Sequence, residues 1–227
     1  DPGLSTHSLA SGRYHPTVLA PEEALRESVD VVFSALPHGA SADVCEPLFG
    51  RVPVIDLSAD FRFGNEQTYV HAYGAPRPAP LFQDRAVYGL TEWNRDALAD
   101  ATIVANPGCY PTATLLPLLP GIHAGVVTGT IVVNALSGIS GAGRTPKTNT
   151  LFAERSENAG AYNPGTLHRH RAEIQEQVDR TAPKHHRSEV IFTPHLVPMK
   201  HGMEATTRDA AGHHEHINKT TNNRHRR

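Results

Sequence analysis

Residues 102–112 read Thr-Ile-Val-Ala-Asn-Pro-Gly-Cys-Tyr-Pro-Thr, and they hold a strand, a turn and the start of a helix. Thr102–Asn106 is an apolar, β-branched run of the length that forms a buried strand. Pro107-Gly108 breaks this run, and a helix is expected to begin near Cys109, with Pro111 in its first turn. A strand that enters a helix through so short a turn is typical of a parallel α/β sheet.

The same alternation of short apolar runs and helical patterns extends in both directions from this stretch. Short connections rich in Gly and Pro separate the segments, so the strands are expected to run mostly parallel, with helices on both faces of the sheet. The expected strands are 30–36, 52–57, 102–106, 129–136 and 189–193, and the clearest helices are 91–98, 109–119 and 172–181. The predicted fold class is therefore α/β.

The composition limits the class of protein. The chain has 227 residues, enough for one large or two smaller domains, and its hydrophobic fraction of 39% is sufficient for a packed core. Its 21 Lys and Arg against 23 Asp and Glu give a net charge of −2, which argues against a nucleic acid or an anionic membrane as partner. No apolar run approaches the roughly 20 residues that span a bilayer, and two cysteines form no disulfide framework. We expect a soluble, cytoplasmic protein.

Cys109 is a candidate nucleophile because of its place at the start of the expected helix. Unpaired N–H groups and the helix dipole stabilise an anion there, and for cysteine that anion is the reactive thiolate. The alternative is a buried structural cysteine, which is the more common role of a free thiol. Cys45 lies on the apolar stripe of its expected helix and receives that structural interpretation.

The second candidate is His168-Arg169-His170-Arg171, which precedes the helix expected over 172–181. Imidazole has a pKa near neutral pH, and Cys–His pairs commonly activate a thiol after meeting in space rather than in sequence. The alternative is a solvated basic loop. His168 and His170 would share one face in a strand but not in a helix.

The third candidate is the Gly- and Ser-rich segment Ser137–Arg144, followed by Lys147. Small residues, hydroxyl groups and a guanidinium suit a phosphate group, although a flexible connector is the alternative. Asp60-Phe61-Arg62 is interpreted as an internal ion pair that holds the following loop. The chain has fifteen histidines, but their densest groups lack carboxylates or cysteines at ligand spacing, so no metal site is expected.

Seven segments together resemble the N-acetyl-gamma-glutamyl-phosphate reductase family, which is similar to aspartate-semialdehyde and glyceraldehyde-3-phosphate dehydrogenases. They occur in the family's order and cover about residues 28–203. The segments are Ala35–Gly39, Asp56–Arg62, Tyr88–Glu92, Asn106–Thr112, Ser137–Arg144, His168–His170 and Thr193–Met199.

The resemblance implies an oxidoreductase of arginine biosynthesis that uses NADPH to reduce an acyl phosphate. Cys109 matches the family's nucleophile, which would expel phosphate and form a thioester; reduction would then give N-acetylglutamate 5-semialdehyde. His170, or failing that His168, would act as acid and base, and the Cys109 N–H would stabilise the oxyanion. The family also implies a homo-oligomer.

Binding residues are assigned by the same combination of position and resemblance. Turns after parallel strands are where an open α/β sheet binds a dinucleotide, and an acyl phosphate needs backbone donors and a cation. The expected NADP-binding residues are Pro37, His38, Gly39, Asn106, Pro107, Ser137, Gly138, Ser140 and Gly141, and the expected substrate-binding residues are Ser140, Arg144 and Lys147.

The chain departs from the family at both ends. The family's glycine-rich turn for pyrophosphate is not found before Asp30, so we expect a partial Rossmann-type NADP-binding domain over 1–106 and part of an α+β catalytic and dimerisation domain over 107–203. Residues 204–227 are rich in His, Arg, Asn and Thr and are expected to form a disordered tail. Two alternatives remain: a non-catalytic remnant of the enzyme, and a Cys–His acyltransferase or hydrolase.

Overall fold

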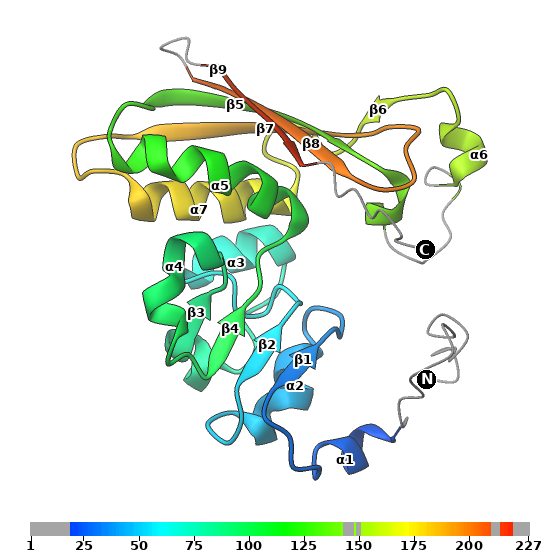
Figure 1. Cartoon of the computed structure of the whole chain (residues 1–227), viewed down its shortest axis with the longest axis vertical. Helices are drawn as coiled ribbons and strands as arrows, with labels where there is room; N and C mark the ends of the chain where they lie inside the picture. The colour runs from blue at the N-terminus through cyan, green and yellow to red at the C-terminus, as the bar shows by residue number, and fades with distance from the viewer. Residues whose placement is uncertain (1–18, 143–147, 149–150, 210–213, 220–227) are drawn as a thin grey trace, which may run out of the picture.

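The structure is a computed structural model that describes residues 19–142, 148, 151–209 and 214–219 (Figure 1). Its first sheet has four strands in the order β1-β2-β4-β3, and all neighbouring pairs are parallel. The strands are β1 (Val32–Ser34), β2 (Val54–Asp56), β3 (Ala86–Tyr88) and β4 (Ile103–Ala105). The prediction of an α/β fold that begins with a parallel sheet is confirmed.

Helices and 3-10 turns connect these strands. Asn65 caps α3, since its side chain accepts a hydrogen bond from the Thr68 N–H, and Gly74 ends α3 in the left-handed conformation. Cys45 is buried in the core of this first unit, as expected. The elements are α1 (Pro21–Ala24), α2 (Ser41–Cys45), η2 (Glu46–Leu48), α3 (Glu66–Tyr73), η3 (Pro80–Arg85) and α4 (Thr91–Leu98).

The chain passes from β4 into α5 (Cys109–His123) through Asn106–Gly108, where the sequence analysis places its domain boundary. The helix begins at Cys109 as predicted, and its buried side chains pack on the second sheet. The second long helix, α7 (Arg169–Thr181), begins three residues earlier than predicted, because His168 supplies its N-cap.

The second sheet has five strands in the order β6-β7-β5-β8-β9. β5 and β7 are parallel, whereas β8 pairs antiparallel with β5, and β6 and β9 are antiparallel edge strands. Figure 1 shows α5 and α7 side by side against one face of this sheet. The remaining elements are β5 (Gly129–Ser137), η4 (Ile139–Ala142), α6 (Phe152–Arg155), β6 (Gly160–Ala161), β7 (Ser188–Leu196), β8 (Met203–Asp209) and β9 (His214–Lys219).

The expectation of a disordered tail after residue 203 is wrong for residues 204–209. They belong to β8, and Ala205, Thr207 and Asp209 alternate in burial with their neighbours. Residues 214–219 also pair with β8 as β9. Few large apolar side chains are needed here, because the backbone of β8 is hydrogen-bonded to strands on both sides. Residues 210–213 and 220–227 lie outside the described part of the chain.

No helix in the part of the chain that the structure describes has both the length and the apolar character needed to cross a membrane.

Candidate active site

Cys109 is the first residue of α5, and Gly108 is the N-cap before it. The N–H groups of Cys109 and Tyr110 both approach the sulfur and favour the thiolate. Although Cys109 is exposed as a residue, the protein packed around the sulfur removes water from it and thereby raises the pKa of the thiol, against the opposing effect of these N–H groups and of Arg62. The expected stabilisation of the thiolate by the helix start is present but outweighed, since desolvation raises the pKa of the thiol more than these groups lower it.

A cavity of about 510 Å³ brings Cys109, His168 and His170 together. The same cavity is lined by Arg155, Arg169, Tyr110, Tyr162 and Gly141, among others. The sequence expectation that the thiol and the two imidazoles meet in space agrees with this arrangement, while their chemical roles stay predictions.

His170 lies directly against the turn that carries Cys109. A Cβ atom on Gly108 would come within 2.6 Å of His170 Nε2, so the ring occupies the space that any side chain at position 108 would need. Its Nδ1 is buried and has no hydrogen-bond partner among the described residues. Burial, together with the neighbouring His168 and Arg62, lowers the pKa of His170 well below its usual value. The imidazole is therefore neutral at pH 7, and the same surroundings disfavour its protonated form.

His168 has a different role in the local structure. Its Nδ1 accepts a hydrogen bond of 3.1 Å from the His170 N–H, which caps α7 and places the ring proton on Nε2. Burial and the nearby Arg169 lower the pKa of His168 to about 4. The centroids of the two imidazole rings are 4.9 Å apart. They can lie this close because His168 precedes the helix, so its side chain is not directed by helical geometry.

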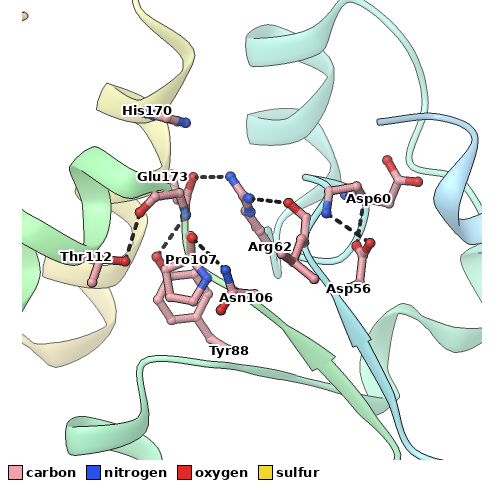
Figure 2. A network of polar contacts seen from close by, with 12 residues as sticks. Asp56, Asp60, Arg62, Tyr88, Asn106, Pro107, Thr112, His170 and Glu173 are labelled. Atoms are coloured by element: carbon pink, nitrogen blue, oxygen red, sulfur yellow. Dashed lines mark hydrogen bonds and ion pairs between the residues drawn. The ribbon is translucent and has the colours of Figure 1, made fainter. Parts of the chain in front are cut away.

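Sequence reasoning missed Glu173, which lies one helical turn after His170 and is buried. Figure 2 shows its carboxylate at the centre of a polar network. Oε1 accepts hydrogen bonds from the Tyr88 hydroxyl at 2.8 Å and from the Gly108 N–H at 3.0 Å. Oε2 is 3.3 Å from Arg62 Nη1. The sequence signal that could have identified Glu173 is a charged residue at a helix position that faces the core.

The expected ion pair between Asp60 and Arg62 is wrong. The Asp60 carboxylate instead accepts the N–H groups of Gly39 at 2.6 Å and Ala42 at 2.9 Å, at the start of α2. Arg62 points the other way, toward Glu173 (Figure 2). Burial raises the pKa of Asp60, and the two N–H donors oppose that rise. Residues 60–62 form a turn rather than an extended segment, so the two side chains leave the backbone in different directions.

The residues expected to bind NADP after the first-sheet strands lie at the carboxyl ends of β1 and β4. Gly39 has a φ of +82°, and a Cβ atom there would meet nothing within 4 Å, so this turn is open. The Asn106 N–H donates to Asp56 O at 2.8 Å, which holds the end of β4 against the end of β2. This edge of a parallel sheet fits a dinucleotide by position, and Pro37, His38, Gly39, Asn106 and Pro107 would contribute to holding it.

The segment Ser137–Gly141 does not offer the free backbone donors that the sequence analysis expected. The N–H groups of Gly138, Ile139 and Ser140 donate to the carbonyl groups of Gly202, Met199 and Lys200, at 3.0, 2.9 and 3.1 Å. The Gly141 N–H donates to Gly138 O.

The small residues of this segment therefore serve contacts within the chain. A Cβ atom on Gly138 would lie 2.9 Å from the backbone nitrogen of His201, and Ser140 Oγ is hydrogen-bonded to His201 Nδ1 at 3.0 Å. Gly141 still lines the cavity beside Cys109. Arg144 and Lys147 lie outside the described residues.

Two family models match this chain. One is described as semialdehyde dehydrogenase, dimerisation domain, and matches residues 109–224. The other is described as semialdehyde dehydrogenase, NAD binding domain, and matches residues 5–101.

Curated relatives carry a more specific name. The N-acetyl-gamma-glutamyl-phosphate reductase of Desulforudis audaxviator is 50% identical over 184 residues, which cover 80% of this chain and 52% of that protein. The reductase of the same name from Rhodopirellula baltica is 46% identical over 204 residues, which cover 88% of this chain and 58% of that protein. The chain thus spans about half the length of the curated relatives it matches.

Among solved structures, the aspartate semialdehyde dehydrogenase with NADP from Candida albicans superposes with a TM-score of 0.51 at 12% identity. The match covers 90% of this chain and 60% of that one. At this identity the likeness concerns the fold alone.

Proposed function

Because this chain belongs to the semialdehyde dehydrogenase family, we propose that it acts as an N-acetyl-gamma-glutamyl-phosphate reductase. The reaction is the NADPH-dependent reduction of N-acetyl-gamma-glutamyl phosphate to N-acetylglutamate 5-semialdehyde and phosphate, a step of arginine biosynthesis. The observation that carries the proposal is the placement of Cys109 and His170 in one cavity, at the adjoining starts of α5 and α7.

The first half of the reaction uses only groups of this chain. Burial raises the pKa of the Cys109 thiol and lowers that of His170, so both groups are neutral in the free site, and His170 takes the thiol proton as the sulfur attacks. The sulfur attacks the acyl carbon, and the bond between that carbon and the phosphate oxygen breaks. His170 returns its proton to the departing phosphate, and a thioester on Cys109 remains.

The N–H groups at the start of α5 stabilise the negative oxygen of the tetrahedral intermediate, with the Cys109 N–H as the first candidate. NADPH, when bound, supplies the hydride that reduces the thioester carbonyl carbon. The resulting tetrahedral adduct then collapses to the aldehyde and releases the Cys109 sulfur, which recovers a proton from solvent. His168 keeps the His170 backbone in place through its cap and is not the proton carrier.

The charge of the cavity supports an anionic substrate. Arg155 and Arg169 both line it beside Cys109. Arg144 and Lys147 remain proposed phosphate ligands on the resemblance alone, and Ser140 contributes at most its hydroxyl group, since its N–H is used within the chain. Cofactor binding is assigned to the turns after β1 and β4 rather than to the main chain of 138–141.

The proposal includes a homodimer, in keeping with the description of the matching family model. In the part of the chain that the structure describes, no helix covers the face of the second sheet opposite α5 and α7 (Figure 1). Val132 and Ile191 are paired neighbours on that face and are 36% and 40% exposed. A second copy of this chain would remove this apolar surface from water. Two free thiols suit a reducing compartment such as the cytoplasm.

The test separates acyl transfer from reduction. The purified chain is incubated with N-acetyl-gamma-glutamyl phosphate in the absence of NADPH and NADP. The mass of the Cys109 peptide is measured by mass spectrometry, and the released phosphate is quantified in the same samples. We expect one N-acetylglutamyl group on Cys109 per phosphate released, none in Cys109→Ser, and normal acylation in the matched control Cys45→Ser. The semialdehyde, phosphate and NADP together should then yield NADPH, except in Cys109→Ser.

Two results would contradict the proposal. Failure of Cys109 to become acylated would remove the nucleophile from the mechanism. Continuous release of phosphate and free acid without nicotinamide would instead identify a hydrolase.

A further inference from the structure

Arg62 is a buried arginine that connects the two units of the molecule, and the proposed reaction has not yet used it. It lies in the loop that follows β2, and its Nη2 donates to Leu57 O of the same loop at 2.9 Å. Its Nη1 is 3.3 Å from Glu173 Oε2 on α7. The guanidinium therefore holds α7 against the loop of the first sheet (Figure 2).

The residue between these groups is Gly108, immediately before the nucleophile. Its N–H donates to Glu173 Oε1 at 3.0 Å. A Cβ atom on Gly108 would lie 3.0 Å from Arg62 Nη1 and 2.6 Å from His170 Nε2. Arg62, Glu173 and His170 thus surround one backbone unit, and a shift of any of them would move the start of α5.

The charge of Arg62 also acts on the reacting pair. Its positive charge favours the Cys109 thiolate and the neutral form of His170, while Glu173 opposes the thiolate. Salt screens buried charges much less than exposed ones. The other charged or titratable groups around Cys109 are His168, Arg169 and His170 at the start of α7, Arg155 of α6, and the phenols of Tyr110 and Tyr162.

We propose that Arg62 is a positioning residue for the nucleophile: through Glu173 it holds the Gly108–Cys109 turn against His170, and its charge favours the ionised sulfur. This inference rests on the proposed role of Cys109. A purely structural role, in which Arg62 only ties the two units together, predicts a change in stability without a change in the chemistry of the sulfur.

The experiment measures the pH dependence of Cys109 alkylation by iodoacetamide in the purified chain, without substrate, by mass spectrometry of the Cys109 peptide. In Arg62→Met we expect the midpoint of the profile to rise by about one pH unit, equivalent to an alkylation rate about tenfold slower near neutral pH. Arg62→Lys keeps the charge and should stay within about threefold of the parent chain.

The matched control is Arg77→Met. Arg77 Nη1 donates to the carbonyl groups of Phe63 and Gly64, both at 3.1 Å, in the segment that follows Arg62, and Arg77 is not among the residues that surround Gly108 or line the cavity. This control should leave the alkylation profile unchanged. If Arg62→Met does not fold, as judged by circular dichroism, Arg62→Gln replaces it, because the amide keeps one donor toward Glu173 while the charge is removed.

The inference would be overturned if the alkylation profile of Arg62→Met or Arg62→Gln equalled that of Arg77→Met. It would also be overturned if the profile of Arg62→Lys shifted as far as that of Arg62→Met or Arg62→Gln. The outcome is independent of reductase activity. If the parent chain reduces no acyl phosphate but the alkylation profile shifts as expected, the proposed function fails while the role of Arg62 stands.

Discussion

Gly108 shows how closely the site is packed around one small residue. Its φ of −62° and ψ of 160° are open to any amino acid, so backbone strain is not the reason for glycine here. The reason is space, since the His170 ring and the Arg62 guanidinium occupy the position of the missing side chain. The proposed exchange of a proton between the Cys109 thiol and the His170 imidazole needs this close approach.

We predict that Gly108→Ala displaces His170 and slows acylation of Cys109 about a hundredfold, since a displacement near 1 Å has an effect of that size. The rate of thioester formation on Cys109 is the measurement. Gly64→Ala is the matched control, because a Cβ atom there would meet only the ends of Arg180 and Glu176 side chains, at 3.3 Å. An unchanged rate in Gly108→Ala would show that the close contact does not matter.

The start of α7 is stabilised by an unusual cap. Histidine is not among the preferred N-cap residues, yet His168 Nδ1 accepts the His170 N–H. The cap works only while Nδ1 is unprotonated, so the helix that carries His170 and Glu173 depends on pH. Protonation of His168 would remove the acceptor and place a positive charge at the positive end of the helix dipole.

The pKa of His168 is about 4 in the folded chain, below the ordinary value of 6.5, so protons bind more tightly to the unfolded chain. Burial and then Arg169 cause this shift, so the unfolding free energy is highest above pH 6.5 and falls by a total of about 3 kcal/mol as the pH drops toward 4. His170, whose pKa is also lowered, adds a decline of the same sign.

We predict that His168→Asn, which keeps a good N-cap residue, reduces the loss of unfolding free energy between pH 7 and pH 5. Urea unfolding at the two pH values measures that loss. The matched control His185→Asn replaces an exposed histidine and should show the same loss as the parent chain. If His168→Asn also shows the full loss, the cap does not titrate in this range.

At the scale of the whole molecule, the second sheet is packed against helices on one face only in the described part of the chain. The second sheet has α5 and α7 on one face, and its alternating burial leaves Val132 and Ile191 exposed on the other (Figure 1). These two apolar side chains lie among polar neighbours such as Thr130 and Glu189, and exposed apolar side chains on a sheet face are a candidate subunit interface. Because the helix starts that carry Cys109 and His170 pack on the opposite face, the interface would not block the cavity.

We predict that Ile191→Asp weakens self-association at least tenfold, since a charge would be buried without a partner between two copies. Sedimentation velocity over a range of concentrations measures the association constant. Leu81→Asp is the matched control, because Leu81 is 84% exposed on the first unit, away from this sheet. Equal association by both variants would place the interface elsewhere.

Local sequence patterns were enough to place β1, β2, β4, β5 and β7 and the start of α5 at Cys109, because strand length, turn residues and helix starts depend on neighbours along the chain. The short parallel strand β3 was missed, because three residues give too little pattern in a loop-rich stretch. The partners in the site were not accessible in this way: Arg62 and Glu173 are 111 residues apart, and their pairing depends on how α7 packs against the first sheet. The same holds for the raised pKa of Cys109, the occupied N–H groups of 138–141 and the burial of β8. Desolvation and hydrogen-bond partners are properties of the packed molecule, and they arise only when distant segments exclude water from one another.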